Sequence, residues 1–323
     1  MVWIKKLVSI KYNVIIILVM LKKYTYKNLT WIDAENPSKS EVGSLMEEYD
    51  LDPAVAQEIS LPTYKPKIVR NDKYIYLVLH FPAYRHTHCG DMPQEIDFVI
   101  GSDFLITTSY CHVDQIENIA KIFEVQSMIE RDYFQDNPGA LFHYIMKELY
   151  KGLSDEIDYI NDSLQTIEKK IFQGQEKQMV IALSGVNRNL LNFRNSIDSQ
   201  TEVIEDLEDI GREFFSLSYV YNLNDIASEH FKVQKALEKN ISLLSELRET
   251  NNSLLSTKQN EIMKTLTIIT VIVMPFSIVA SMFQMGMTYA PIVGMDYDFY
   301  WVVAFEILIA ILIFIIARRK KWL

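Results

Sequence analysis

The chain has 323 residues, 49% of them apolar and 23% charged, so it can bury a sizeable core and is neither disordered nor fibrous. Its 10 glycines and 9 prolines favour long uninterrupted helices, and its 2 cysteines exclude a disulfide scaffold. The net charge of −10 understates the acidity of the body, because residues 1–27 and 318–321 are basic. This composition argues against nucleic acid as a partner and favours cations.

The N-terminal segment contains a short apolar run at residues 14–21. The run is too short to cross a membrane, and no small-residue cleavage site follows it, which argues against a signal peptide. We interpret residues 1–20 as an appended or non-native segment; the alternative is that translation starts at Met20.

Residues 21–139 are predicted to form an α/β domain. Residues 38–58 have helical character, and Gly101-Ser102-Asp103 is typical of a hairpin turn between two strands. The segments predicted as strands are 29–33, 74–81, 95–100 and 104–109.

Residues 140–264 are predicted to form a stalk of long, coiled-coil-like helices. Apolar residues recur every three or four positions, and no proline occurs from residue 140 until Pro275. Turns are expected near Gly174 and Gly211. Because no helix breaker lies between Asp225 and Pro275, the last helix should continue into the membrane.

Residues 265–323 are predicted to cross the membrane twice. No charged side chain occurs from Thr265 to Met287, and Glu306 is the single charge in the second run at 299–317. Each run approaches or exceeds the ~20 residues that a spanning helix needs.

The orientation follows from the basic residues. Lys258 and Lys264 precede the first span, a basic tail follows the second, and the loop 288–298 has no lysine or arginine. Positive charge stays on the cytoplasmic side, so we expect a multi-pass protein of the cytoplasmic (inner) membrane with both termini inside and a short outer loop.

One side of the first span differs chemically from the others. Its residues are polar, small or sulfur-bearing at alternating steps of three and four, whereas isoleucine, valine and phenylalanine fill the remaining faces. The stripe is Asn260, Met263, Thr267, Thr270, Met274, Ser277 and Ser281. Such a face either lines a pore with copies of itself or packs against another helix, and both readings stay open at this point.

Several segments resemble the CorA magnesium-transporter family over residues 29–323. They are Thr30-Trp31-Ile32-Asp33, Lys65-Pro66-Lys67, Asn260 to Ile269, Met274-Pro275-Phe276, Tyr289-Ala290-Pro291 and Lys320-Lys321-Trp322-Leu323. The resemblance implies a funnel-shaped homopentamer with an α+β cytoplasmic domain, helical stalk and two C-terminal transmembrane helices. It also implies a central channel for hydrated Mg²⁺, with Co²⁺ and Ni²⁺ often accepted.

The resemblance assigns the pore residues. Those that match pore-lining positions are Asn260, Met263, Leu266, Met274 and Ser277, with Met263 and Leu266 as the apolar constriction. The family's Gly-Met-Asn signature is missing, and an ungapped match places Gln284-Met285-Gly286 at the pore mouth. A match shifted by two would place Gly286-Met287-Thr288 there, but the ungapped match keeps both flanks without an insertion. Gln284 or backbone carbonyls could accept hydrogen bonds from a hydrated cation, but this departure leaves the selectivity open.

The resemblance also implies regulation by the transported ion. Glu58 and Asp225 match two carboxylates that would meet across a subunit boundary and hold cytoplasmic Mg²⁺, closing the pore. The alternative is that both are ordinary surface acids.

Two further features have both a functional and a structural interpretation. His86, His88 and Cys89, with Cys111 and His112, could bind zinc, although incidental histidines in a variable loop explain them as well. Glu306 within the second span is either functional or a packing residue.

No nucleophile–base pair, phosphate loop or catalytic acid pair occurs, so the sequence does not predict an enzyme. We expect a passive Mg²⁺ channel. The alternatives are a zinc or nickel/cobalt transporter of the same architecture, and a non-conducting membrane sensor or scaffold.

Overall fold

The computed structural model describes residues 20–83, 93–129, 137–214, 220–284 and 297–319. The chain forms two compact units. The first contains Met1–Ile167 and Leu183–Leu244, and the second contains Glu168–Ala182 and Ser245–Leu323. The division predicted at residues 139 and 264 stays a prediction. Of the N-terminal segment 1–20, the described part is Met20, which begins a strand.

The first unit is built on a mixed sheet of six strands in the order β1-β2-β6-β5-β4-β3. The strands are β1 (Met20–Tyr26), β2 (Leu29–Glu35), β3 (Lys67–Arg70), β4 (Tyr74–Phe81), β5 (Gln94–Gly101) and β6 (Phe104–Ser109). β2 and β6 are parallel, and every other neighbouring pair is antiparallel. The predicted hairpin of β5 and β6 is confirmed, whereas the sequence analysis missed β1 and β3.

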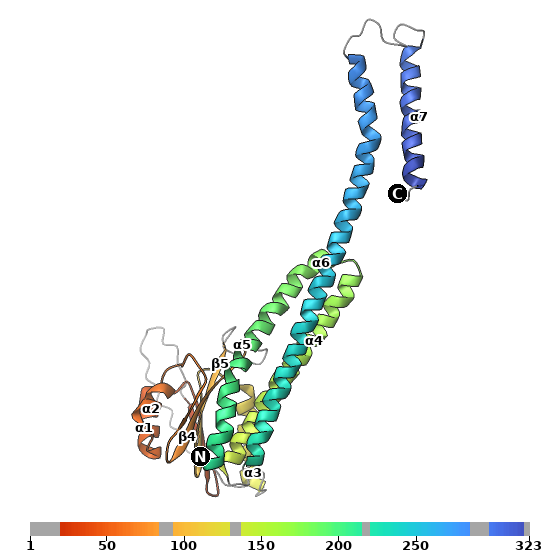
Figure 1. The fold of residues 1–323 in the computed structure, drawn as a ribbon. Helices are drawn as coiled ribbons and strands as arrows, with labels where there is room; N and C mark the ends of the chain where they lie inside the picture. The colour runs from red at the N-terminus through yellow and green to blue at the C-terminus, as the bar shows by residue number, and fades with distance from the viewer. Residues whose placement is uncertain (1–19, 84–92, 130–136, 215–219, 285–296, 320–323) are drawn as a thin grey trace, which may run out of the picture. The chain divides into compact units, whose positions relative to one another are not determined.

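Two short helices cover one face of the sheet, as Figure 1 shows. They are α1 (Lys39–Tyr49) and α2 (Pro53–Ile59). α1 begins with a capping box in which Ser38 and Glu41 bond each other's backbone amides, and Asp52 caps α2 just before Pro53. The apolar core on this face contains Ile32, Val42, Leu45, Leu51, Val55, Ala56, Ile59, Tyr74, Tyr76, Val78, Val99, Phe104 and Ile106.

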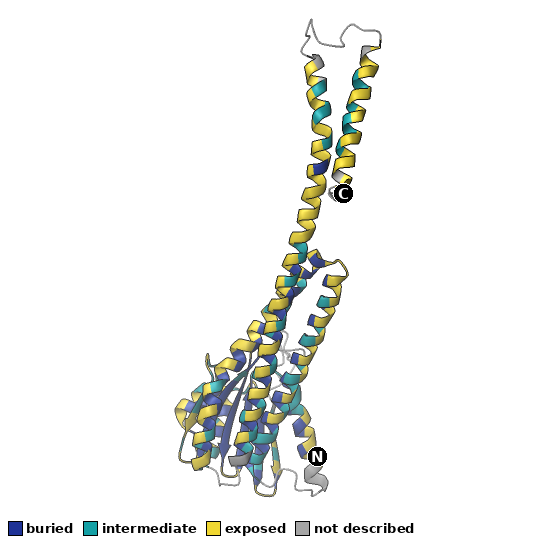
Figure 2. Ribbon diagram, turned by 45° about the vertical axis from the view of Figure 1, so that its right-hand side comes forward, coloured by how far each residue is buried: buried dark blue, intermediate teal, exposed yellow. Residues whose placement is uncertain are grey.

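The opposite face is covered by longer helices. They are α3 (Asp114–Ile129), α4 (Pro138–Phe172), α5 (Glu176–Phe214) and the start of α6 (Val220–Gln284). Edge-on aromatic contacts hold this layer to the sheet, with ring centroids 5.1 Å apart for Phe98 and Phe142 and 5.7 Å apart for Trp31 and Phe123. The central strands β4, β5 and β6 are accordingly buried along almost their whole length (Figure 2).

The turn predicted near Gly174 is confirmed: Gly174 has φ +88° and lies between α4 and α5. The helix end predicted near Gly211 comes three residues later, at Phe214, and α6 begins at Val220. A Cβ added at Gly211 would lie 2.4 Å from Leu223 Cδ1. This glycine therefore reflects a close approach of α5 and α6 rather than a helix end.

Among the described residues, two helices are long and apolar enough to cross a membrane, as predicted. They are α6, a single helix that includes both Asp225 and Pro275, and α7 (Asp298–Arg319). Within the candidate spans only 6% of the α6 window and none of the α7 window is buried in the protein (Figure 2). Long apolar helices without protein cover are typical of segments that contact lipid or other copies of the chain.

Candidate functional site

The stripe predicted on the first span lies on α6 within the second unit. All its members, together with Leu266, are exposed. They are Asn260, Met263, Leu266, Thr267, Thr270, Met274, Ser277 and Ser281. A shallow open groove of about 700 Å³ includes Thr270, Met274, Ser277 and Ser281 among its lining residues.

The partly buried side of the span is not the side of the stripe. Its partly buried residues are Ile272, Pro275, Phe276 and Val279. At 3.6 residues per turn, these lie on the side of α6 opposite Thr270, Met274 and Ser277. The stripe is therefore the side that the rest of the described second unit leaves uncovered.

Several hydroxyl groups of the stripe are bonded within their own helix. Thr267 Oγ1 donates to the Met263 carbonyl at 2.8 Å, Thr270 to Leu266 at 2.9 Å, and Ser281 to Ser277 at 2.7 Å. A hydroxyl group has one proton and two lone pairs, so each of these oxygens presents only acceptor capacity to its surroundings. Such oxygens suit the outward-pointing protons of a hydrated cation.

The two acids expected to bind regulatory Mg²⁺ lie in the first unit, and each already has a cationic partner. Glu58, in the last turn of α2, forms an ion pair with Lys67 of β3. Asp225, near the start of α6, accepts from His143 Nε2 at 2.9 Å and from Lys147 Nζ at 3.1 Å. The described part of one chain does not bring Glu58 and Asp225 into contact.

These partners change the chemistry of Asp225. Partial burial alone would raise its pKa, but the hydrogen bonds from His143 and Lys147 outweigh that effect and lower the pKa. Asp225 is thus an ionised carboxylate at neutral pH, as a metal ligand must be. A cation that binds there has to compete with Lys147 and His143.

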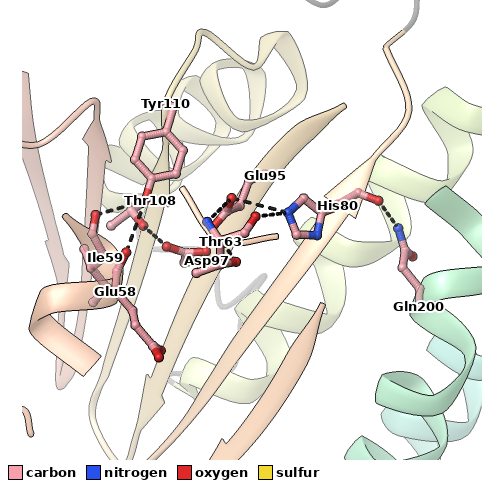
Figure 3. Close-up of polar contacts among 9 residues, drawn as sticks. All are labelled: Glu58, Ile59, Thr63, His80, Glu95, Asp97, Thr108, Tyr110 and Gln200. Atoms are coloured by element: carbon pink, nitrogen blue, oxygen red, sulfur yellow. Dashed lines mark hydrogen bonds and ion pairs between the residues drawn. The ribbon is translucent and has the colours of Figure 1, made fainter. Parts of the chain in front are cut away.

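A second group of acids lies beneath the end of α2 (Figure 3). Glu95 and Asp97 lie two positions apart on β5, on the same side of the strand, and are 5% and 0% exposed. Glu95 accepts from Thr63, and Asp97 accepts from Thr108. Tyr110 Oη donates to the Glu58 and Ile59 carbonyls at 3.3 and 3.2 Å, which fixes the C-terminal end of α2.

The family of this chain follows from comparison with known proteins. The family model described as CorA-like Mg²⁺ transporter protein matches residues 26–319. The chain belongs to the CorA-like family. The predicted resemblance is thereby confirmed over nearly the whole sequence, and transporters, not enzymes, make up this family.

Individual relatives cover the same length. The cobalt/magnesium transport protein CorA of Thermotoga maritima is 25% identical over 91% of this chain and 83% of its own length. The protein of the same name from Methanocaldococcus jannaschii is 22% identical over 91% and 92%. The solved structure of the CorA magnesium transporter from M. jannaschii has a TM-score of 0.79, with 20% identity and 92% of both chains covered. The predicted fold is therefore confirmed for one chain.

Several residues singled out in the CorA-like sequence lie outside the described part. They are His86, His88, Cys89, Met285 and Gly286, while Gln284 is described as the last residue of α6 but without its side chain. Among the described residues no group of three or more His, Cys, Asp or Glu side chains has a geometry that could hold a metal ion.

His112 and Glu306 lie in the described part of the chain. His112 contacts Glu117 at 2.8 Å and Glu35 at 3.2 Å. Burial opposes its protonation, but these carboxylates raise its pKa. Glu306 is on the partly buried side of α7, and its role stays a prediction.

The sequence analysis missed a link in the second unit. Lys258 donates to Glu176 Oε2 at 2.5 Å and to the Gly174 carbonyl at 3.4 Å. From sequence alone, Lys258 is only a positive charge that precedes the span. The sequence analysis also missed Glu95 and Asp97 of β5. Two acids within an otherwise apolar strand are unusual, and this signal is visible in the sequence.

Proposed function

We propose that this CorA-like chain forms an oligomeric channel, a homopentamer, in which copies of α6 surround a pore for divalent cations, Mg²⁺ first. The membrane is the cytoplasmic membrane, both termini lie inside, and the ion moves passively. An inside-negative potential favours entry by ~2.3 kcal/mol per unit charge per 100 mV, so a divalent ion needs no ATP.

The observation that carries this proposal is the position of the stripe. Thr270, Met274 and Ser277 lie opposite the partly covered side of the span and are not used for packing within the described unit. A polar helix side left uncovered within one chain is unfavourable in lipid, so it needs copies of itself or water. A ring of such helices supplies both.

The pore would pass from an apolar to a polar section. Met263 and Leu266, which are 59% and 55% exposed, supply an apolar constriction that can close by dewetting. Beyond it, Thr267, Thr270 and Ser281 offer hydroxyl acceptors to the water shell of the ion. Gln284, Met285 and Gly286 are proposed as the mouth.

We further propose that Mg²⁺ closes the channel by binding between Glu58 of one subunit and Asp225 of the next. Support comes from the ionised state of Asp225 and from its contact with Lys147, a half-exposed cation that Mg²⁺ can displace. Loss of the ion would let subunits separate and the constriction rehydrate.

Substituted cysteines test the pore. Thr270→Cys and Ser277→Cys should make Mg²⁺ flux in proteoliposomes sensitive to a charged thiol reagent, whereas Ile272→Cys and Val279→Cys are the matched controls on the opposite side. Equal sensitivity of both pairs, or of neither while flux is intact, would remove the stripe from the pore.

Flux of several ions separates the alternatives. Transport of Mg²⁺, with or without Co²⁺ and Ni²⁺, supports the proposal, and transport of Zn²⁺ alone, or of Ni²⁺ and Co²⁺ alone, supports the transporter alternative. No flux of any ion through correctly assembled protein would favour a non-conducting sensor or scaffold.

A further inference from the structure

Two acids are buried on the α1/α2 face of the sheet. Glu95 and Asp97 lie two positions apart on β5 and therefore on the same side of the strand, followed by Val99 of the apolar core. Their residues are 5% and 0% exposed. A charge at such depth is costly unless it is hydrogen-bonded or paired.

Glu95 meets this requirement as a carboxylate. It accepts from the Thr63 backbone amide at 3.0 and 2.8 Å and from Thr63 Oγ1 at 2.9 Å. His80 Nε2 lies 3.3 Å from its Oε2 and 2.9 Å from the Thr63 carbonyl (Figure 3). Glu95 and His80 thus fasten the segment that follows α2 to the sheet.

As a carboxylate, Asp97 does not meet this requirement for hydrogen bonds or a charged partner. Its Oδ2 accepts from Thr108 Oγ1 at 3.0 Å, but its buried Oδ1 has no hydrogen-bond partner in the described structure. The Asp97 carboxyl group is within reach of Glu95, so two acceptors face each other unless one of them holds a proton.

Among the described residues, no lysine or arginine is paired with Asp97. The titratable neighbours are His80 and Tyr76 of β4, Tyr110 directly after β6, and Glu58 of α2. Lys67 of β3 is paired with Glu58. Burial raises the pKa of both phenols, so they stay neutral. Burial first, and then the charge of Glu95, hold the pKa of Asp97 well above its usual range.

We infer that Asp97 is a proton-binding site: its carboxyl group keeps a proton on Oδ1 at neutral pH and donates it to the Glu95 carboxylate. The pair then carries one negative charge, and both carboxyl groups are satisfied. When base removes the proton, Glu95 and Asp97 are both negatively charged. Their repulsion weakens the contact between Glu95 and Thr63, which attaches the segment after α2 to the sheet. The inference does not depend on transport.

Infrared spectroscopy of the full-length protein in detergent tests the inference, because a protonated carboxylic acid absorbs apart from a carboxylate. Aspartate labelled with ¹³C at the side-chain carboxyl group restricts the signal to aspartate. At about pH 7.5 the wild type should retain a protonated-aspartate band, which should disappear only in more alkaline buffer. Absence of that band in wild-type protein would overturn the inference without any variant.

Variants assign the proton. Asp97→Asn should abolish the neutral-pH band, whereas Asp33→Asn, a change at another buried aspartate bonded to a threonine, should retain it. Glu95→Gln, which removes the neighbouring charge, should shift the loss of the Asp97 band to lower pH. A band that survives Asp97→Asn, or a midpoint that Glu95→Gln leaves unchanged, would refute the shared proton.

Discussion

Lys258 Nζ lies 2.5 Å from Glu176 Oε2, which joins α6 to the first residue of α5 within the second unit. Lys258 also reaches the Gly174 carbonyl of the α4–α5 turn. The contact is two residues before Asn260, where the proposed pore stripe begins. The α4–α5 turn is therefore attached to α6 immediately before the stripe.

Lys258→Met should loosen this turn. We expect faster amide hydrogen exchange at residues 172–178, because the Glu176 carboxylate loses its partner. Lys235→Met is the control, since Lys235 forms an exposed pair with Glu238 on the same helix. The exchanged pair Lys258→Glu with Glu176→Lys should restore protection, and unchanged exchange in Lys258→Met would contradict the attachment.

Lys147→Met should lower the Mg²⁺ concentration that protects the protein from proteolysis, because Lys147 no longer competes for Asp225. Asp225→Asn should abolish the protection. Lys151→Met, one turn further along α4 and paired with Glu148 at 3.7 Å, is the matched control. Equal Mg²⁺ dependence in all four proteins would refute the regulatory site.

The stability of the first unit should depend on the protonation of Asp33. Burial is the main cause that raises the pKa of Asp33 to about 6 from 3.8. The folded state therefore binds the proton more tightly, and this contribution is complete below about pH 3.8 and is lost as the pH rises through about 6. The shift corresponds to roughly 3 kcal/mol of unfolding free energy.

Asp33→Asn should flatten this pH dependence. Trp31 fluorescence is a suitable measurement, because Trp31 Nε1 donates to Thr107 Oγ1, the group that also bonds Asp33. Urea unfolding followed at several pH values between about 4 and 7 should show a smaller slope in the variant than in the wild type. Identical slopes would show that Asp33 titrates normally.

Ser277→Val should reduce Mg²⁺ flux, because it replaces a hydroxyl acceptor of the proposed pore with two methyl groups. We expect roughly a tenfold loss, equivalent to about 1.4 kcal/mol in the barrier. Val279→Thr, an isosteric change on the partly buried side of the span, is the control. The flux of the two variants is compared in proteoliposomes at equal protein content. A larger loss in Val279→Thr than in Ser277→Val would show that the stripe does not line the pore.

The sequence predicted the elements whose pattern is strong. β4 and the β5–β6 hairpin combine β-branched and aromatic residues with a clear turn, and α6 lacks any breaker before Pro275. β1 was missed because its lysines resembled a basic tail, and β3 because only four residues pair, next to Pro66. Local patterns do not record such edge pairing.

The candidate site was predictable only in part. The spacing of the stripe placed Thr270 and Ser277 on one side of a helix, but which side stays uncovered requires the structure. The partners of Asp225 and Glu95 could not be read from sequence either. His143 is 82 residues from Asp225, and Thr63 is 32 residues from Glu95, so only folding brings them together.

The internally bonded hydroxyls of α6 have a consequence for the sign of the permeating charge. Since Thr267, Thr270 and Ser281 have already donated their protons, these three hydroxyl groups of the proposed pore offer no donor to a chloride or phosphate ion. A metal ion surrounded by water would meet electron pairs at the same height in each copy. In the proposed pore, the direction of these three neutral dipoles would favour a hydrated metal ion over an anion.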